Sequence, residues 1–264
     1  MYIFLIVCIF AASLISSMVG QGGGVLYTPI QVWFDTNVHQ AATTSLFLIM
    51  VLSSSSLLTF AKSGWIDWPL AIVLESVTSL SAFVGALFSS GFREVILLYI
   101  LAGAITVAAL PLIMNIERKH VEQSCKSGFA SWRRNTDNRQ YCVNLFIAIP
   151  VSIIAGLVSG MVGVGGGILK VAAMVLLLGV PVEIAVASSS IMVGITAVGG
   201  FTGHLINEMW EWKKAIPLAV VVFAGAQIGS RISIGLDKKK LEKILGWLLL
   251  AIAAVTIIKI FRNY

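Results

Sequence analysis

Two glycine clusters interrupt long apolar runs of the sequence, GQGGG at Gly20–Gly24 and GVGGG at Gly163–Gly167. Glycine adopts positive φ readily and lets a ligand approach the main chain closely. A short helix that begins directly after such a break presents unpaired N–H groups and the positive end of its dipole. Two such ends would bind an anion without any catalytic group. Close helix packing, which small residues permit in membranes, is the alternative explanation.

Polar side chains near the two breaks are the other expected members of an anion site. Lys170 follows the second break by three residues, and a lysine within an apolar run is by default a functional residue. The alternatives are a lysine that reaches an interface or pairs with a carboxylate. The serine and threonine hydroxyls either complete the site or cap helices. The expected substrate-binding set is Gly22, Gly23, Gly24, Tyr27, Thr44, Ser45, Gly165, Gly166, Gly167, Lys170, Ser188 and Ser189.

Glu75 is the one carboxylate deep within a long apolar run. It can pair with Lys170 or line a polar cavity, or it can carry a proton during transport. The roles of Glu75 and Lys170 are therefore considered as linked.

No other constellation predicts catalysis or a cofactor. Ser188 and His204 are the nearest nucleophile and base, but they lie sixteen residues apart on one run, about 24 Å along a helix. The cysteines Cys8, Cys125 and Cys142 have no metal spacing, and their odd number predicts no disulfide framework. We expect no catalytic residue, no metal and no cofactor, and hence no enzyme.

The composition excludes an ordinary soluble domain. Of the 264 residues 58% are hydrophobic and only 11% are charged, and the mean hydropathy is +0.96. A soluble domain is about a quarter charged, so this chain cannot cover a globular surface with charge. The net charge of +6 lies in the gaps between apolar runs, which argues against nucleic acid as a partner. Membrane lipid is the expected surrounding.

Eight runs are long and apolar enough to be expected as spanning helices, since a bilayer core needs roughly 20 such residues. Two shorter segments, Val25–Phe34 and Ile168–Val180, each follow a glycine cluster and are too short to cross alone. The eight runs are Met1–Val19, Ala41–Ala61, Trp68–Phe92, Val95–Ile116, Cys142–Val162, Ile184–Asn207, Ala215–Ser230 and Ile244–Ile258.

The two halves of the chain repeat one another. Ser16–Ile30 and Ser159–Ala173 are identical at eight of fifteen positions, at an offset of 143. After one inserted residue the offset becomes 144, which aligns Thr44-Ser45 with Ser188-Ser189, and Trp68 with Trp212. Each half is therefore expected to hold a first helix, a glycine break, a short returning segment and three spanning helices.

Basic residues set the expected orientation by the positive-inside rule. The linker, residues 117–141, carries six of them, so we place it in the cytoplasm, which puts both termini outside. The two halves then start on opposite sides. The sequence predicts an all-α polytopic membrane protein of two inverted repeats, each with a glycine-broken re-entrant hairpin and three spanning helices. The expected division is a first repeat at residues 1–116, the cytoplasmic linker at 117–141 and a second repeat at 142–264.

These motifs resemble the TauE/SafE family of sulfite exporters and related anion permeases. The resemblance rests on GQGGGVLYTP in the first half and on GVGGGILKVAAMVLLLGVP followed by AVASSS in the second. Its glycine motifs match Gly20–Gly24 and Gly163–Gly167, and its Thr-Ser motif matches Thr44-Ser45 and Ser188-Ser189. Two departures, Ala172 in place of a proline and Ala-Ser-Ser in place of Ala-Thr-Ser, leave the substrate open.

The resemblance implies a secondary transporter of the plasma membrane. It would export a small anion, such as sulfite, a sulfonate or a related organic anion, by alternating access. An anion channel and a non-transporting membrane scaffold are the alternatives. The sequence sets neither the coupling ion nor the oligomeric state.

Overall fold

The structure is a computed structural model that describes residues 2–19, 24–34, 36–113, 131–136, 139–206 and 210–233, with 247, 250, 251, 253, 254 and 256–258. Helices dominate these residues. The elements before the linker are α1 (Tyr2–Val19), α2 (Gly24–Trp33), α3 (Val38–Phe60), the 3-10 turn η1 (Ala61–Ser63), α4 (Trp68–Ser89) and α5 (Glu94–Ile113). Those after it are β1 (Ser131–Thr136), β2 (Arg139–Asn144), α6 (Leu145–Val162), α7 (Gly167–Leu176), α8 (Val182–Ile206) and α9 (Trp212–Ser233).

Five of the described helices are long and apolar enough to cross a membrane, namely α3, α4, α6, α8 and α9. The apolar stretches Ile3–Met18 in α1 and Glu94–Val107 in α5 are shorter. The last expected span, Ile244–Ile258, lies largely outside the described residues. Large apolar side chains such as Leu80 and Val220 are 67% and 68% exposed, as expected of a surface that faces hydrocarbon rather than water.

The expectation of an all-α protein is wrong in one place, because the linker contains a β-hairpin. β1 and β2 pair antiparallel from Ser131 opposite Asn144 to Thr136 opposite Arg139. Exposure alternates along β1, with Trp132, Arg134 and Thr136 on its covered face. The strand continues through Asn144, so α6 begins at Leu145 rather than at Cys142, with the Asn144 side chain accepting from the Phe146 N–H at 3.0 Å.

The cysteines also differ from the expectation. Cys142 on β2 forms a disulfide, and Cys8 is the free cysteine among the described residues. Cys125 lies outside the described residues. Disulfides are rare in proteins of a reducing cytosol, so this bond bears on the side of the membrane on which the linker lies.

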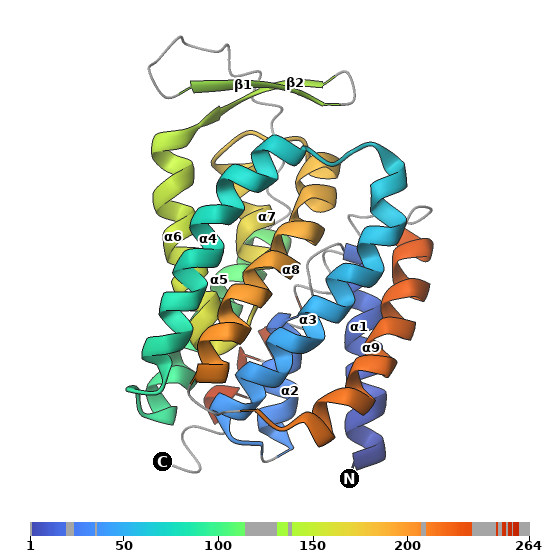
Figure 1. Cartoon of the computed structure of the whole chain (residues 1–264), viewed down its shortest axis with the longest axis vertical. Coiled ribbons are helices and arrows are strands. Elements are labelled where there is room, and N and C mark those ends of the chain that lie inside the picture. The colour runs from blue at the N-terminus through green and yellow to red at the C-terminus, as the bar shows by residue number, and fades with distance from the viewer. Residues whose placement is uncertain are drawn as a thin grey trace.

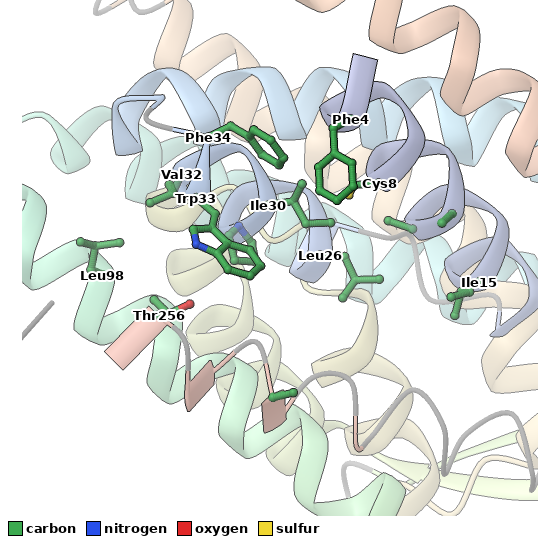
Figure 2. A pocket seen from close by; sticks show the side chains of 14 residues that line it. Phe4, Cys8, Ile15, Leu26, Ile30, Val32, Trp33, Phe34, Leu98 and Thr256 are labelled. Atoms are coloured by element: carbon green, nitrogen blue, oxygen red, sulfur yellow. The ribbon is translucent and has the colours of Figure 1, made fainter. Parts of the chain in front are cut away.

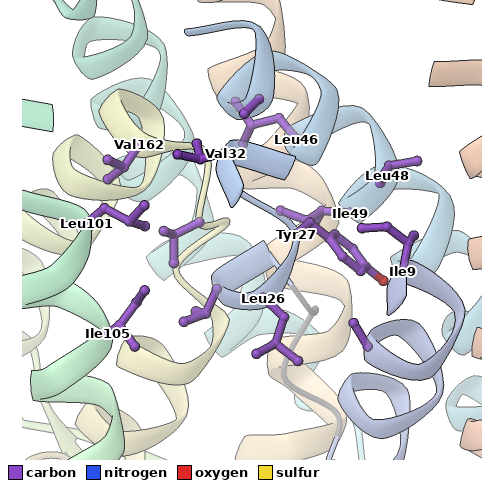
Figure 3. Packing of buried hydrophobic residues seen from close by; sticks show 14 of the residues in the cluster. Ile9, Leu26, Tyr27, Val32, Leu46, Leu48, Ile49, Leu101, Ile105 and Val162 are labelled. Carbon is purple, nitrogen blue, oxygen red and sulfur yellow. The ribbon is translucent and has the colours of Figure 1, made fainter. Parts of the chain in front are cut away.

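The helices pack in two groups around the crossing of α3 and α8. α4 lies along α6 and α8, while α9 lies along α1 and α3 (Figure 1). In the same view α1 starts at the lower end, near the mark for the N-terminus, and α6 starts at the upper end beneath the hairpin. The short helices α2 and α7 pack on α3 and α8 respectively. The larger apolar cluster joins both halves, with Tyr27 and Ile49 from the first and Val162 from the second (Figure 3).

Glycines let α4 and α6 approach until backbone meets backbone. A Cβ on Gly160 of α6 would lie 1.9 Å from the carbonyl oxygen of Ala82, and one on Gly85 of α4 would lie 2.4 Å from that of Leu157. Neither distance is compatible with a side chain. By contrast, a Cβ on Gly103 of α5 would meet nothing within 4 Å.

We therefore predict that Gly160→Ala destabilises the protein in detergent by about 1–3 kcal/mol, the usual cost of overpacking. Gly103→Ala is the matched control and should be neutral or stabilising, because alanine favours a helix more than glycine does. Thermal unfolding of the two purified variants checks the difference. Equal melting temperatures would show that α4 and α6 can separate freely.

Candidate functional site

The second glycine cluster breaks the chain between α6 and α7. Gly163 ends α6 in the left-handed conformation at φ 72°, and Gly165 and Gly166 follow at φ 72° and 68°. L-residues with a Cβ rarely adopt such angles. Gly166 is the N-cap of α7 and no side chain caps this helix start in the part of the chain that the structure describes. The first N–H groups of α7 are therefore without the partner that a serine or aspartate cap would supply.

The break is enclosed by both halves of the molecule. Thr28 of α2 donates a hydrogen bond from Oγ1 to the carbonyl oxygen of Gly163 at 3.2 Å. A Cβ on Gly165 would lie 2.7 Å from Ile49 of α3 and 3.1 Å from Val193 of α8. The returning segment of the first half thus contacts the break of the second. Of the first cluster, Gly20, Gly22 and Gly23 lie outside the described residues, and Gly24 is the first residue of α2.

Ser159 is a polar group at this break that the sequence analysis did not select. Its side chain is fully buried, and its Oγ has no hydrogen-bond partner among the described residues. A Cβ on Gly166 would lie 3.6 Å from that oxygen, so the hydroxyl adjoins the start of α7. Ser16 occupies the same place in the first copy of the repeat, and this shared serine was the signal that could have revealed it.

Lys170, in the first turn of α7, forms a buried ion pair with Glu75 of α4. The Nζ–Oε2 distance is 2.6 Å, and the side chains are 4% and 1% exposed. Lys170 also donates to Thr196 Oγ1, and its Nζ lies 3.5 Å from the carbonyl oxygen of Met192, both on α8. Thr196 in turn donates to Glu75 Oε1. Of the alternatives for Lys170, pairing with a carboxylate is the one that the structure supports.

The matching corner of the first half is apolar. By the repeat offsets Tyr27 corresponds to Lys170, Ala219 to Glu75 and Leu52 to Thr196. Tyr27 is fully buried in the larger cluster near Ile9, and its hydroxyl has no partner among the described residues (Figure 3). Tyr27 and Lys170 therefore lie in different surroundings, one apolar and one ionic.

The hydroxyl motifs lie in the second turns of their helices, so the reading of them as caps is wrong. Asn37 caps α3, accepting from the His39 N–H at 2.9 Å, and α8 begins at Val182, six residues before Ser188. Ser45 accepts from Gln31 Nε2 at 2.9 Å. Thr44, Ser45, Ser188 and Ser189 are all buried. These side chains face protein rather than lipid.

Asp67, immediately before α4, is a second buried acid that the sequence analysis passed over. Arg134 of β1 donates to it twice, Nε to Oδ2 at 3.0 Å and Nη2 to Oδ1 at 2.6 Å. Thr136 and Tyr141 of the hairpin donate to Oδ2, and the Leu70 N–H donates to Oδ1 as an N-cap bond. The Asp67 N–H itself donates to Ser188 Oγ at 3.0 Å.

The charge of Asp67 is firmly held. Burial raises the pKa of its carboxyl, but the hydrogen bonds from Arg134, Tyr141, Leu70 and Thr136 outweigh burial and keep the pKa below the ordinary 3.8. Because the pKa is lowered, the stability that this cluster contributes is present above the ordinary value and is lost only as the pH falls through the lowered one. The cluster is therefore ionised and intact throughout the neutral range.

An apolar cavity of about 430 Å³ lies elsewhere, between α1, α2, α5 and the last described segment (Figure 2). Its lining includes Phe4, Ile30 and Trp33 and contains no charged side chain. It is therefore unsuited to an anion. The described residues also contain no group of histidine, cysteine and acidic side chains that would hold a metal.

Comparison with known proteins gives the family. A family model described as "Sulfite exporter TauE/SafE" matches residues 5–256. The chain belongs to this family. It is a membrane transporter and not an enzyme, and a TauE/SafE protein is expected to act on a small anion.

Relatives of the TauE/SafE chain cover nearly its whole length. The probable membrane transporter protein YunE of Bacillus subtilis (strain 168) is 23% identical over 260 residues, 95% of each chain. A probable membrane transporter protein of Methanocaldococcus jannaschii is 26% identical over 262 residues, 95% of this chain and 92% of the relative. One of Xylella fastidiosa (strain Temecula1) is 25% identical over 247 residues, 91% and 88% of the two chains. No solved structure matches the chain.

We predict that Lys170→Met destabilises the protein by about 3–5 kcal/mol, because it leaves Glu75 buried without its counter-charge. The double variant Lys170→Met with Glu75→Leu should recover most of that loss, since the buried charge is then removed altogether. Unfolding in detergent measures both. Equal losses in the single and double variants would mean that the two side chains do not interact.

Proposed function

We propose that this protein exports a small anion by alternating access, with the anion bound between the start of α7 and the ammonium of Lys170. The observation that carries the proposal is the glycine break itself. It joins a helix start and a buried Ser159 hydroxyl that have no side-chain partner among the described residues, together with a buried lysine in the first turn of the same helix. N–H groups, a hydroxyl and a cation are the donors that an oxyanion such as sulfite accepts.

Glu75 gives this site its coupling. In the described state the carboxylate neutralises Lys170, so an incoming anion competes with it for the same ammonium. When Glu75 takes a proton, Lys170 is left as an unpaired buried cation, which is costly in a low-dielectric interior. An anion then restores neutrality. Anion binding and proton binding therefore favour one another, and the anion and the proton move together.

Alternating access is supported by the way in which the two halves contact each other. Gly85 of α4 meets the Leu157 carbonyl of α6, and the corresponding Gly229 of α9 meets the Leu14 carbonyl of α1 at 2.3 Å from its ideal Cβ. One helical turn away a serine meets a glycine in both contacts. Ser81 of α4 lies against Gly156 of α6, and Ser13 of α1 lies against Gly225 of α9. A pair of matched, reciprocal contacts is what two inverted repeats require.

The test is anion efflux from proteoliposomes loaded with sulfite. Glu75→Gln keeps the shape of the side chain but fixes it in the neutral form. We expect this variant to bind sulfite more tightly than the unaltered protein and to transport it without dependence on a pH gradient. Thermal shift measures binding, and efflux at several internal pH values measures coupling.

Three results would count against the proposal. Efflux by Glu75→Gln that still follows the pH gradient removes Glu75 as the proton carrier. Currents far above carrier rates indicate a channel. Sulfite binding that is unchanged in Ser159→Ala, and also in the double variant Lys170→Met with Glu75→Leu, would mean that the anion binds elsewhere or that the protein is a non-transporting scaffold.

We further propose that the linker lies in the cytoplasm of a plasma-membrane protein. On this orientation twelve of the eighteen basic residues of the sequence are cytoplasmic, as the positive-inside rule favours. The disulfide at Cys142 argues for the opposite side. The charges act during insertion, before a disulfide can form, and therefore set the orientation.

The two readings make opposite predictions in intact cells. On a cytoplasmic linker the Cys142 thiol is reduced and reacts with a membrane-permeant maleimide but not with an impermeant one. A variant in which Cys8, Cys125 and Cys142 are all serine gives the background, because replacing Cys142 alone would free the thiol of its disulfide partner. Cys142 that resists both reagents until an external reductant is added would place the hairpin outside.

A further inference from the structure

The hairpin cluster and the Lys170 site lie on the same faces of the same two helices. Asp67, the N-cap of α4, and Ala71 and Glu75 within that helix are spaced four residues apart. On α8, Ser188, Met192 and Thr196 are spaced likewise. Residues four apart share one face of a helix. The Asp67–Ser188 contact therefore stands about 12 Å, or eight residues, along the helices from the Glu75–Thr196 contact.

Apolar side chains fill the space between these two polar contacts. Ala71 and Met192 are 2% and 1% exposed, and both belong to one buried cluster. The same cluster includes Tyr141 and Val143 from the hairpin and Met174 from α7. The hairpin thus packs against the seam between α4 and α8, as well as bonding to its end.

We propose that the hairpin is the gate at the linker end of the transport pathway and that Arg134–Asp67 is its latch. In the described state the latch holds the starts of α4 and α8 together over Lys170. The role of the hairpin as a gate rests on the proposed function, whereas the contacts that close it do not. For the anion to leave or enter at this end, Arg134 must release Asp67, and the Asp67 N–H must release Ser188.

The Arg134–Asp67 latch is strong enough to define a closed state, yet its partly exposed guanidinium allows the two side chains to separate. Asp67 has no exposed side-chain surface, whereas Arg134 keeps 18% of its side chain exposed and stacks on Trp132 at 4.7 Å from the ring centroid. Paired guanidinium and carboxylate groups make directional, charge-assisted hydrogen bonds. The exposed edge gives water a route to the guanidinium, so that the pair can be solvated as it parts.

The test measures access to the seam beneath the latch. Ala71→Cys is introduced into a chain in which Cys8, Cys125 and Cys142 are all serine, and its labelling by an impermeant maleimide is followed in membrane vesicles with the linker side outward. Asp67→Asn removes the charge but keeps a side chain that caps a helix well. Asp67→Asn and Arg134→Gln, each made singly, should raise the labelling rate by about ten-fold or more, because the open population increases.

Arg133→Gln is the matched control. Arg133 neighbours Arg134 on β1 but lies on the exposed face of the strand, so its loss removes the same charge without touching Asp67. Its labelling rate should stay within about two-fold of the unaltered chain.

The outcomes separate the gate from the proposed function. Equal labelling in Asp67→Asn, Arg134→Gln and Arg133→Gln refutes the gate, whether or not the chain transports sulfite. Faster labelling in the first two variants, in a protein that neither binds nor moves sulfite, keeps the gate and refutes the substrate assignment. Size-exclusion profiles of the detergent-purified variants exclude unfolding as the cause of faster labelling.

Discussion

The buried ion pair of Lys170 and Glu75 is the interaction on which the rest of the structure depends. Neither charge is tolerable alone in hydrocarbon or in a protein interior of low dielectric constant. The pair obliges α4, α7 and α8 to meet at one place, since Glu75 comes from the first, Lys170 from the second and Thr196 from the third. It also ties the glycine break to the first half of the chain, because α7 can bring Lys170 to α4 only if it begins as a new helix after Gly166.

The sequence predicts the features that follow from strong local constraints. The breaks at the glycine clusters are predictable because a helix cannot continue through several residues at positive φ, and this held at Gly163–Gly166. The pairing of Lys170 with Glu75 was foreseen as an alternative because each was the single charge of its sign within its apolar surroundings. Helix ends were displaced by a few residues, since Asn37 rather than the threonine and serine run supplies the cap of α3.

What escaped prediction depends on contacts between distant parts of the chain. The linker was read by its charge, and its two six-residue strands have no long apolar alternation to reveal them. Arg134 counted as one more basic residue until its partner Asp67, sixty-seven positions earlier, was in place. Ser159 lies among small residues that normally serve helix packing, so only its lack of a partner sets it apart. The roles of all these residues in transport stay predictions.

The junction between the hairpin and α6 has a mechanical consequence. β2 ends at Asn144 and α6 begins at the next residue, with Asn144 as its cap. Because no loop separates β2 from α6, a tilt of α6 moves the strand that carries Tyr141 with it. The same α6 ends at the glycine break. A tilt of α6 would therefore move the hairpin at one end and the glycine break at the other, and so would couple opening of the hairpin gate to anion binding at the break.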